Sequence, residues 1–296
     1  MPDESSVSNS YDYLWSRTFS SGNTLEDFLT KYKPSMIQDD GTKPWIWVEG
    51  STRALADNYH REKLEAEEEA SKYLEEITEK IEAIENNDSI PNIWSNKKTR
   101  VKGKKEVREQ LQAEAAEKLK EISVKHGHVV GKWLVFASSE KIDQIWAGIA
   151  KSLVSGPLHK TVTFLAKVST LPENVTPNHK HVICVYMPNV YDKEKVTEVM
   201  KILLRNHGVD LKGVKSDLYT LIGLYSNHPS GIRSTVWSNT ALLPDKEIKE
   251  LKDAFFADLP SKKAESKIEE LKPSGDVAGA EKQSGPRYVP PHRRAI

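Results

Sequence analysis

Residues 131–156, with the sequence GKWLVFASSEKIDQIWAGIAKSLVSG, decide the fold of this chain. The first part is short and apolar, and Trp133, Val135 and Phe136 predict a β-strand. After a polar turn, apolar residues recur at helical spacing: Ile142, Ile145, Trp146, Ile149 and Leu153. The stretch therefore predicts a strand and a helix that each bury a tryptophan at the centre of a folded domain.

The composition excludes several classes of protein and site. Lysine and arginine together number 43, as do aspartate and glutamate, so the whole chain is not a strongly basic nucleic-acid binder. No apolar run reaches the ~18 residues of a membrane-spanning helix, and no membrane association is expected. Cys184 is the only cysteine, which excludes disulfides within the chain and cysteine-cluster zinc sites. We expect a reducing, cytoplasmic location, with the nucleus as a second compartment.

Outward from this stretch, the sequence predicts further helices and strands. A short helix is expected at residues 23–29 with Thr24 as its N-cap, followed by an extended segment at 43–49. Strands are expected at 162–168, 181–187, 217–225 and 232–237. Helices are expected from Asp192 to a C-cap at Gly208, and at 244–256.

Residues 52–126 interrupt this pattern and predict an inserted helical hairpin. The segment 52–85 is rich in glutamate, lysine and alanine, and it carries one apolar stripe, as does the segment 104–122. Between the stripes lies a basic run at 97–108, for which a solvated turn and a phosphate-binding surface both remain open.

The chain thus divides into three predicted parts. Residues 1–10 are expected to be disordered, and residues 11–258 form one domain interrupted by the insertion. Residues 259–296 are low in apolar content and are expected to be a disordered, basic, proline-containing tail that includes RYVPP at 287–291.

Several motifs resemble the fold of the cap-binding translation initiation factor 4E. The GKW strand and the helix that closes at Gly156 resemble its centre, and NTLEDFL (23–29), KPWIWVEG (43–50), AKVS (166–169) and HKHVICVY (179–186) follow its order. The motifs are more similar still to the basophilic-leukaemia-expressed protein family, built on a domain of unknown function. The resemblance covers residues 11–50 and 129–240. It implies an α+β fold, a curved antiparallel sheet backed by helices, with the hairpin inserted.

The resemblance also implies a binding site for a methylated purine. In the initiation factor, two aromatic side chains sandwich the cationic base, and a carboxylate accepts hydrogen bonds from its edge. At the matching positions, Trp45 or Trp47 supplies one aromatic face, Trp15 the other, and Glu49 the carboxylate. Glu49 follows Trp47 by two residues, whereas in the family pattern the carboxylate follows the tryptophan directly.

The phosphate-binding positions are altered as well. Ser169 stands where a phosphate-binding arginine is expected, and Lys167 is its candidate substitute. His181, with Lys180 beside it, lies near the position of a second phosphate-binding lysine. The resemblance therefore predicts binding of RNA or a nucleotide without specifying a cap.

For the tryptophans, packing in the protein core is the alternative to contact with a ligand. Trp133 and Trp146 are expected in the core, because large aromatic residues on periodic apolar faces are usually packing residues. Trp45 and Trp47 share one face of an extended segment, and whether that face lines a pocket or a core stays open. Trp15 either contacts a ligand or anchors a terminal strand.

No catalytic or metal-binding pattern is recognisable. The histidine pairs at 126 and 128 and at 179 and 181 have no evident third ligand, and neither a nucleophile elbow nor a phosphate-binding loop occurs. We predict a non-catalytic RNA- or nucleotide-binding protein without metal or cofactor. The alternative is a protein-interaction scaffold without a nucleotide ligand, which recruits proteins through residues 52–126 and the C-terminal tail.

Overall fold

The computed structural model describes residues 13–16, 22–50, 63–91 and 102–270. Residues 1–256 group into one compact unit and residues 257–296 into a second. The predicted N-terminal disorder at 1–10, and the part of the predicted tail from 271 onward, lie outside the described residues.

Within the described residues, a six-stranded open sheet forms the frame of the first unit. Its spatial order is β1 (Leu14–Trp15), β2 (Trp45–Glu49), β4 (Leu165–Ser169), β5 (Lys180–Met187), β3 (Gly131–Ser138) and β6 (Leu211–Ser216). β1 pairs with β2 in parallel, while β2/β4, β4/β5, β5/β3 and β3/β6 are antiparallel. The prediction of a purely antiparallel sheet is therefore wrong at this edge, because the chain between β1 and β2 crosses over through α1 (Leu25–Lys31).

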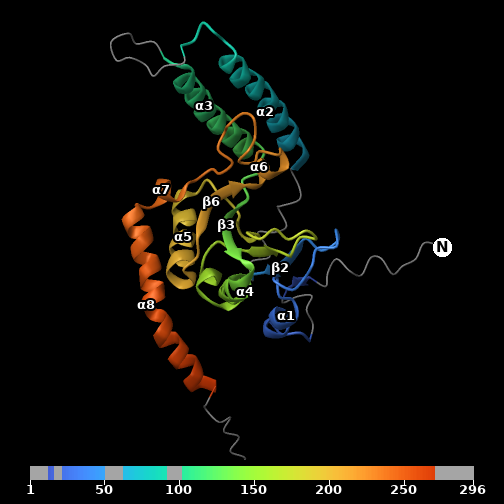
Figure 1. Cartoon of the computed structure of the whole chain (residues 1–296), viewed down its shortest axis with the longest axis vertical. Coiled ribbons are helices and arrows are strands. Elements are labelled where there is room, and N and C mark those ends of the chain that lie inside the picture. The colour runs from blue at the N-terminus through green and yellow to red at the C-terminus, as the bar shows by residue number, and fades with distance from the viewer. Residues whose placement is uncertain (1–12, 17–21, 51–62, 92–101, 271–296) are drawn as a thin grey trace, which may run out of the picture. The chain divides into compact units, whose positions relative to one another are not determined.

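Helices cover one face of the sheet. Residues 131–156 form β3 and α4 (Ser139–Ser155), as predicted, and Trp133 and Trp146 are both buried in the main core. The indole nitrogen of Trp133 donates a hydrogen bond to the Val196 carbonyl, at 3.2 Å, on α5 (Lys193–His207). α1 and the first part of α8 (Asp245–Glu270) add apolar side chains to the same core, and Figure 1 shows these helices around the sheet.

Two predicted helix caps are confirmed. Thr24 precedes α1, where its hydroxyl accepts a hydrogen bond from the Asp27 amide at 3.1 Å and its own amide donates to the Asp27 carboxylate at 3.2 Å. Gly208 follows α5 with a φ of 60°, a left-handed conformation that glycine adopts without steric cost.

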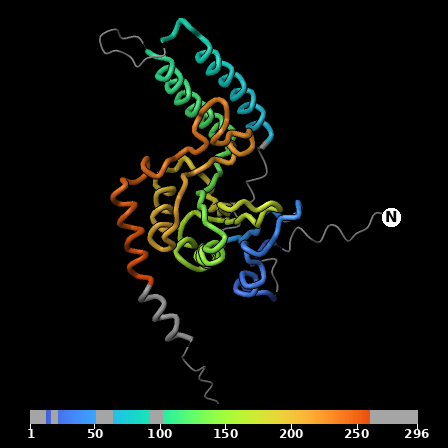
Figure 2. Tube along the Cα trace, viewed as in Figure 1, coloured from blue at the N-terminus to red at the C-terminus, as the bar shows by residue number. Residues whose placement is uncertain are grey.

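The predicted hairpin consists of α2 (Lys63–Glu85) and α3 (Lys104–Lys125), which run side by side in Figures 1 and 2. Their apolar stripes pack together as expected, and the cluster also contains residues that follow β6: Leu218, Tyr219, Leu224 and Ile232. The insertion is therefore packed on the later part of the chain. None of the described helices is long and apolar enough to span a membrane.

The chain after β6 departs from the prediction. Residues 217–225 do not form a strand; they begin with helix α6 (Asp217–Leu221), which starts because the Ser216 hydroxyl accepts a hydrogen bond from the Leu218 amide at 3.2 Å. In place of a strand at 232–237, a single bridge joins Trp237 to Val214. Short elements η5 (Pro157–Lys160) and α7 (Asn239–Leu242) connect longer ones, and α8 continues past its predicted end at 256 to Glu270.

Candidate functional site

The sheet face opposite α4 and α5 carries aromatic and basic side chains. Along β2, Ile46 and Val48 are buried in the main core, so Trp45, Trp47 and Glu49 project from the opposite face. An apolar cluster lies on this face. Its members among the described residues lie on strands and loops, and none of them lies on a helix. We call this surface the lysine face, after its principal side chains: Trp45, Trp47, Lys132, Lys167, Tyr186 and Lys215.

Lys167 lies over the two tryptophans of β2. The backbone register pairs Lys167 with Trp47, and its ammonium nitrogen is 3.9 Å from the ring centroid of Trp45 and 4.7 Å from that of Trp47. Tyr186 stacks near Trp47, with centroids 6.3 Å apart and ring planes inclined by 25°. The two indoles thus already hold a cation that the chain itself supplies.

Lys132 forms a buried ion pair at the neighbouring end of this face. Its ammonium group contacts the Asp217 carboxylate and donates to the Thr220 hydroxyl at 2.9 Å. The exposed fractions of Lys132 and Asp217 are 6% and 4%. This ammonium also lies 5.5 Å from the Tyr186 centroid, and that of Lys167 lies 5.8 Å from the same ring. The two lysines therefore share one aromatic neighbour.

Lys215 is the cross-strand neighbour of Lys132 and is 6% exposed. Its ammonium is 4.0 Å from the ring centroid of Tyr225. Burial, with the nearby Lys132 charge, lowers the pKa of Lys215 to about 8, and burial likewise lowers the pKa of Lys167. Desolvation raises the pKa of the Cys184 thiol between them to about 11, so it stays neutral at physiological pH.

The lysine face carries more positive than negative charge. Lys132 is paired with Asp217, whereas neither Lys167 nor Lys215 forms an ion pair with any carboxylate of the described residues. A desolvated ammonium is costly without a counter-charge, and aromatic rings compensate only part of that cost. The arrangement is suited to an anionic ligand.

Two of the predicted site residues lie on the other side of the sheet. Trp15 pairs with Val48 in the register, is buried in the main core, and donates from its indole nitrogen to the Asn23 carbonyl at 3.4 Å. His181 is fully buried, with one ring nitrogen 2.8 Å from the Ser169 carbonyl and the other 3.1 Å from the Ser139 hydroxyl. The structure therefore does not bring these two side chains together with Trp45 and Trp47.

The remaining predicted site residues lie on the lysine face. Trp45, Trp47 and Lys167 form one contact group, and Glu49 is half-buried at the end of β2. Lys180 is exposed at the start of β5. Ser169 uses its hydroxyl to accept a hydrogen bond from the Val182 amide, at 3.0 Å.

Sequence reasoning missed Lys132, Lys215 and Asp217. Strand alternation in GKWLVFAS, which places Lys132 opposite the buried Trp133, was the signal for the first. Lys215 and Asp217 gave no such signal, because the strand β6 and the helix after it were not predicted. Their placement depends on the pairing of β3 with β6.

Two other kinds of candidate site were considered from the sequence, the basic run at 97–108 and a metal site. Part of the basic run at 97–108 lies outside the described residues; within the described part, Arg108 pairs with Glu85, and Lys104 donates to the Glu85 carbonyl at 2.7 Å. The described residues contain no group of three or more histidine, cysteine, aspartate or glutamate side chains that could hold a metal ion.

A protein-family model matches the part of the chain that forms the lysine face. The model described as basophilic leukemia-expressed protein Bles03 matches residues 3–222. This is more than half of the chain, and the chain therefore belongs to that family. The matched region contains every residue of the lysine face as defined above.

Proposed function

We propose that this member of the Bles03 family is a non-catalytic protein that binds RNA or a nucleotide on its lysine face. The proposal includes the fold of translation initiation factor 4E, which the sequence motifs imply. The observation that carries it is the pair of desolvated ammonium groups, Lys167 and Lys215, that lack a carboxylate partner among the described residues. Phosphate groups would supply the missing negative charge.

The aromatic residues support a ligand that carries bases as well as phosphates. Trp45 and Trp47 are half-buried and keep part of their ring surface accessible. Stacking of a base on an exposed aromatic ring contributes about 1–3 kcal/mol and tolerates any base. A surface with indoles and ammonium groups side by side is typical of proteins that bind single-stranded nucleic acid.

The position of Lys167 affects which bases the lysine face would bind. An N7-methylated guanine is a cation, and the Lys167 ammonium already lies over both indoles. A second cation at that position would meet like-charge repulsion. We therefore propose that the face favours neutral bases with phosphates and gains nothing from methylation of the base.

Replacement of either unpaired lysine should weaken RNA binding. We expect Lys167→Gln and Lys215→Gln each to reduce the affinity for a short single-stranded oligoadenylate about five- to tenfold, because each loses one charge-assisted phosphate contact. Each variant should also make the slope of log affinity against log salt about 0.7 shallower. Tryptophan fluorescence quenching measures both quantities.

The matched control is Lys141→Gln, which removes an exposed lysine from α4 on the covered side of the sheet and should leave the affinity unchanged. GTP, titrated in parallel with its N7-methylated form, should bind at least as tightly as that form, because the cationic base meets the Lys167 ammonium. Absence of quenching by any of these ligands up to about 1 mM would rule out the proposal and leave the protein-interaction scaffold as the function to test.

Binding should also depend on pH. The pKa of Lys215 is lowered to about 8, so its ammonium form is present below that pH and is lost above it. We expect the affinity for oligoadenylate to fall by up to about tenfold from about pH 7 to about pH 9. The phosphodiesters of this ligand do not titrate in that range.

Lys215→Arg separates this effect from other titrations, because arginine stays charged throughout the range. The fall in affinity should be smaller in this variant than in the unmodified chain. An equal fall in both proteins would show that Lys215 is not the titrating group.

A further inference from the structure

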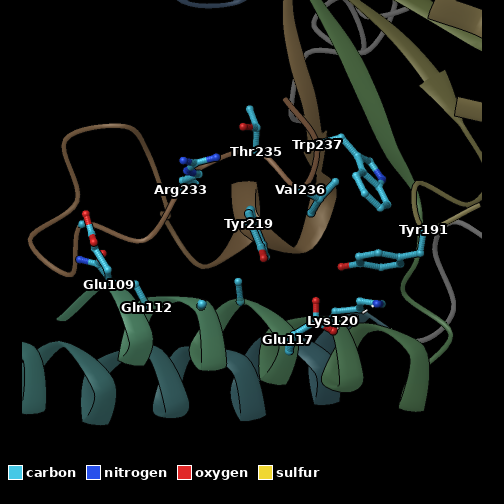
Figure 3. A pocket seen from close by; sticks show the side chains of 13 residues that line it. Glu109, Gln112, Glu117, Lys120, Tyr191, Tyr219, Arg233, Thr235, Val236 and Trp237 are labelled. Atoms are coloured by element: carbon cyan, nitrogen blue, oxygen red, sulfur yellow. Dashed lines mark hydrogen bonds and ion pairs between the residues drawn. The ribbon is translucent and has the colours of Figure 1, made fainter. Parts of the chain in front are cut away.

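A cavity of about 630 Å³ lies between α3 and the segment 231–237, apart from the lysine face (Figure 3). Ala113 and Ala116 of α3 leave room on one side. Tyr191, Tyr219 and Trp237 form the aromatic part of the lining, and Arg233 and Gln112 contribute to it at the other end. Its volume lies within the range of about 300–1,000 Å³ that is usual for small-molecule sites.

Hydrogen bonds fix the aromatic walls of this cavity. The Tyr191 hydroxyl donates to the Ser123 hydroxyl at 3.0 Å, and the Trp237 indole nitrogen donates to the Val190 carbonyl at 2.7 Å. Tyr219 is 2% exposed and is held in the cluster that joins the hairpin to α6. The apolar surface is thus formed before any ligand arrives.

The opposite end of the cavity is held by a contact between α3 and the loop before Arg233. The Gln112 side-chain nitrogen donates to the Ser230 carbonyl at 2.9 Å. Gly231 has a φ of 63°, and a Cβ atom at this position would lie 2.7 Å from the same nitrogen. The Ser230 amide donates to the His228 ring at 3.2 Å, which closes the turn.

Among the charged side chains of the described residues that line the cavity, one cation has no carboxylate partner. Lys120 pairs with Glu117 at 3.2 Å, and Lys105 pairs with the lining residue Glu109 at 3.8 Å. Arg233 forms no ion pair with a carboxylate of the described residues, and the Tyr219 hydroxyl has no hydrogen-bond partner among them. Both groups are hydrogen-bond donors.

We propose that this cavity binds a small organic anion, a planar ring that carries a carboxylate or a phosphate group. The ring would pack against Tyr191, Tyr219 and Trp237. The guanidinium of Arg233 is planar and matches the geometry of either acid group with two parallel hydrogen bonds. The two carboxylates among the described lining residues, Glu109 and Glu117, are each paired with a lysine, which reduces their repulsion of such a ligand.

Isothermal titration calorimetry on the full chain tests this site with three naphthalene compounds. These are 1-naphthoate, 1-naphthyl phosphate and the uncharged 1-naphthalenemethanol. We expect at least one of the two anions to bind at least about tenfold more tightly than the uncharged compound. Preference for the phosphate or for the carboxylate identifies the acid group, and either preference supports the site.

Variants assign the binding to the cavity. Arg233→Gln should remove the advantage of the anion, and Ala116→Trp should weaken binding of all three compounds because the new ring occupies part of the space beside α3. Arg205→Gln, a matched change on α5, should have no effect. Unchanged thermal melting of each variant shows that it is folded.

Several results would overturn the proposal. They are no saturable binding of either anion up to about 5 mM, equal binding of the uncharged compound, or binding that is unchanged in both Arg233→Gln and Ala116→Trp. Binding that is lost in Lys167→Gln and retained in Arg233→Gln would assign the anion to the lysine face and overturn it too. Failure of the RNA titrations leaves this test unaffected.

Discussion

Asp217→Asn is expected to lower the free energy of unfolding by about 3–5 kcal/mol. Lys132 and Asp217 form an ion pair in which both side chains are almost completely buried. Without the carboxylate charge, the Lys132 ammonium remains desolvated beside the cationic Lys215. The variant therefore loses an attraction and keeps a repulsion.

Urea unfolding followed by circular dichroism measures this loss, with a double variant as the comparison. Lys132→Met with Asp217→Leu removes both charges and should be less destabilised than Asp217→Asn alone, because no unpaired charge stays buried. An exposed aspartate on α8, Asp253, provides the control, and Asp253→Asn should be close to neutral. A double variant less stable than the single one would contradict this account of the pair.

Trp133→Ala is expected to cost about 3–5 kcal/mol through the cavity it leaves. Trp133 is fully buried at the centre of β3, between the sheet and α5, and its indole nitrogen is bonded to the Val196 carbonyl. The substitution removes a large apolar surface and leaves that carbonyl without this donor.

Trp45→Ala is the matched comparison for this prediction. Trp45 is only half-buried on the lysine face, so its truncation should cost clearly less than that of Trp133 in the same urea experiment. The same variant should weaken quenching by RNA, which Trp133 cannot contact from the core. Equal destabilisation by the two changes would show that Trp45 is a core residue.

Much of the fold could be predicted because its signals are local. Apolar periodicity identified β3, α4 and the two arms of the hairpin, and Thr24 and Gly208 marked helix ends through bonds to their own neighbours. The strand predicted at 217–225 was wrong. The aromatic residues of this segment favoured a strand, but Ser216 followed by Asp217 is a helix-start signal, and a helix begins there.

The site was predicted only in part, because sheet faces depend on pairing between distant segments. Alternation correctly placed Trp45 and Trp47 on one face, yet it could not say on which face Trp15 would lie. That follows from the pairing of β1 with β2, in which Trp15 lies beside the buried Val48. Lys132 and Lys215 became neighbours through a pairing of the same kind.

The packing of the inserted hairpin has a consequence for the order in which the protein assembles. α2 and α3 are neighbours in sequence, so their mutual contacts form early as the chain leaves the ribosome. Leu218, Tyr219, Leu224 and Ile232, which complete the same cluster, are synthesised about a hundred residues later. Until then, the nascent hairpin exposes the part of its apolar stripe that these residues later cover. We expect a chaperone to bind the nascent chain mainly during this interval.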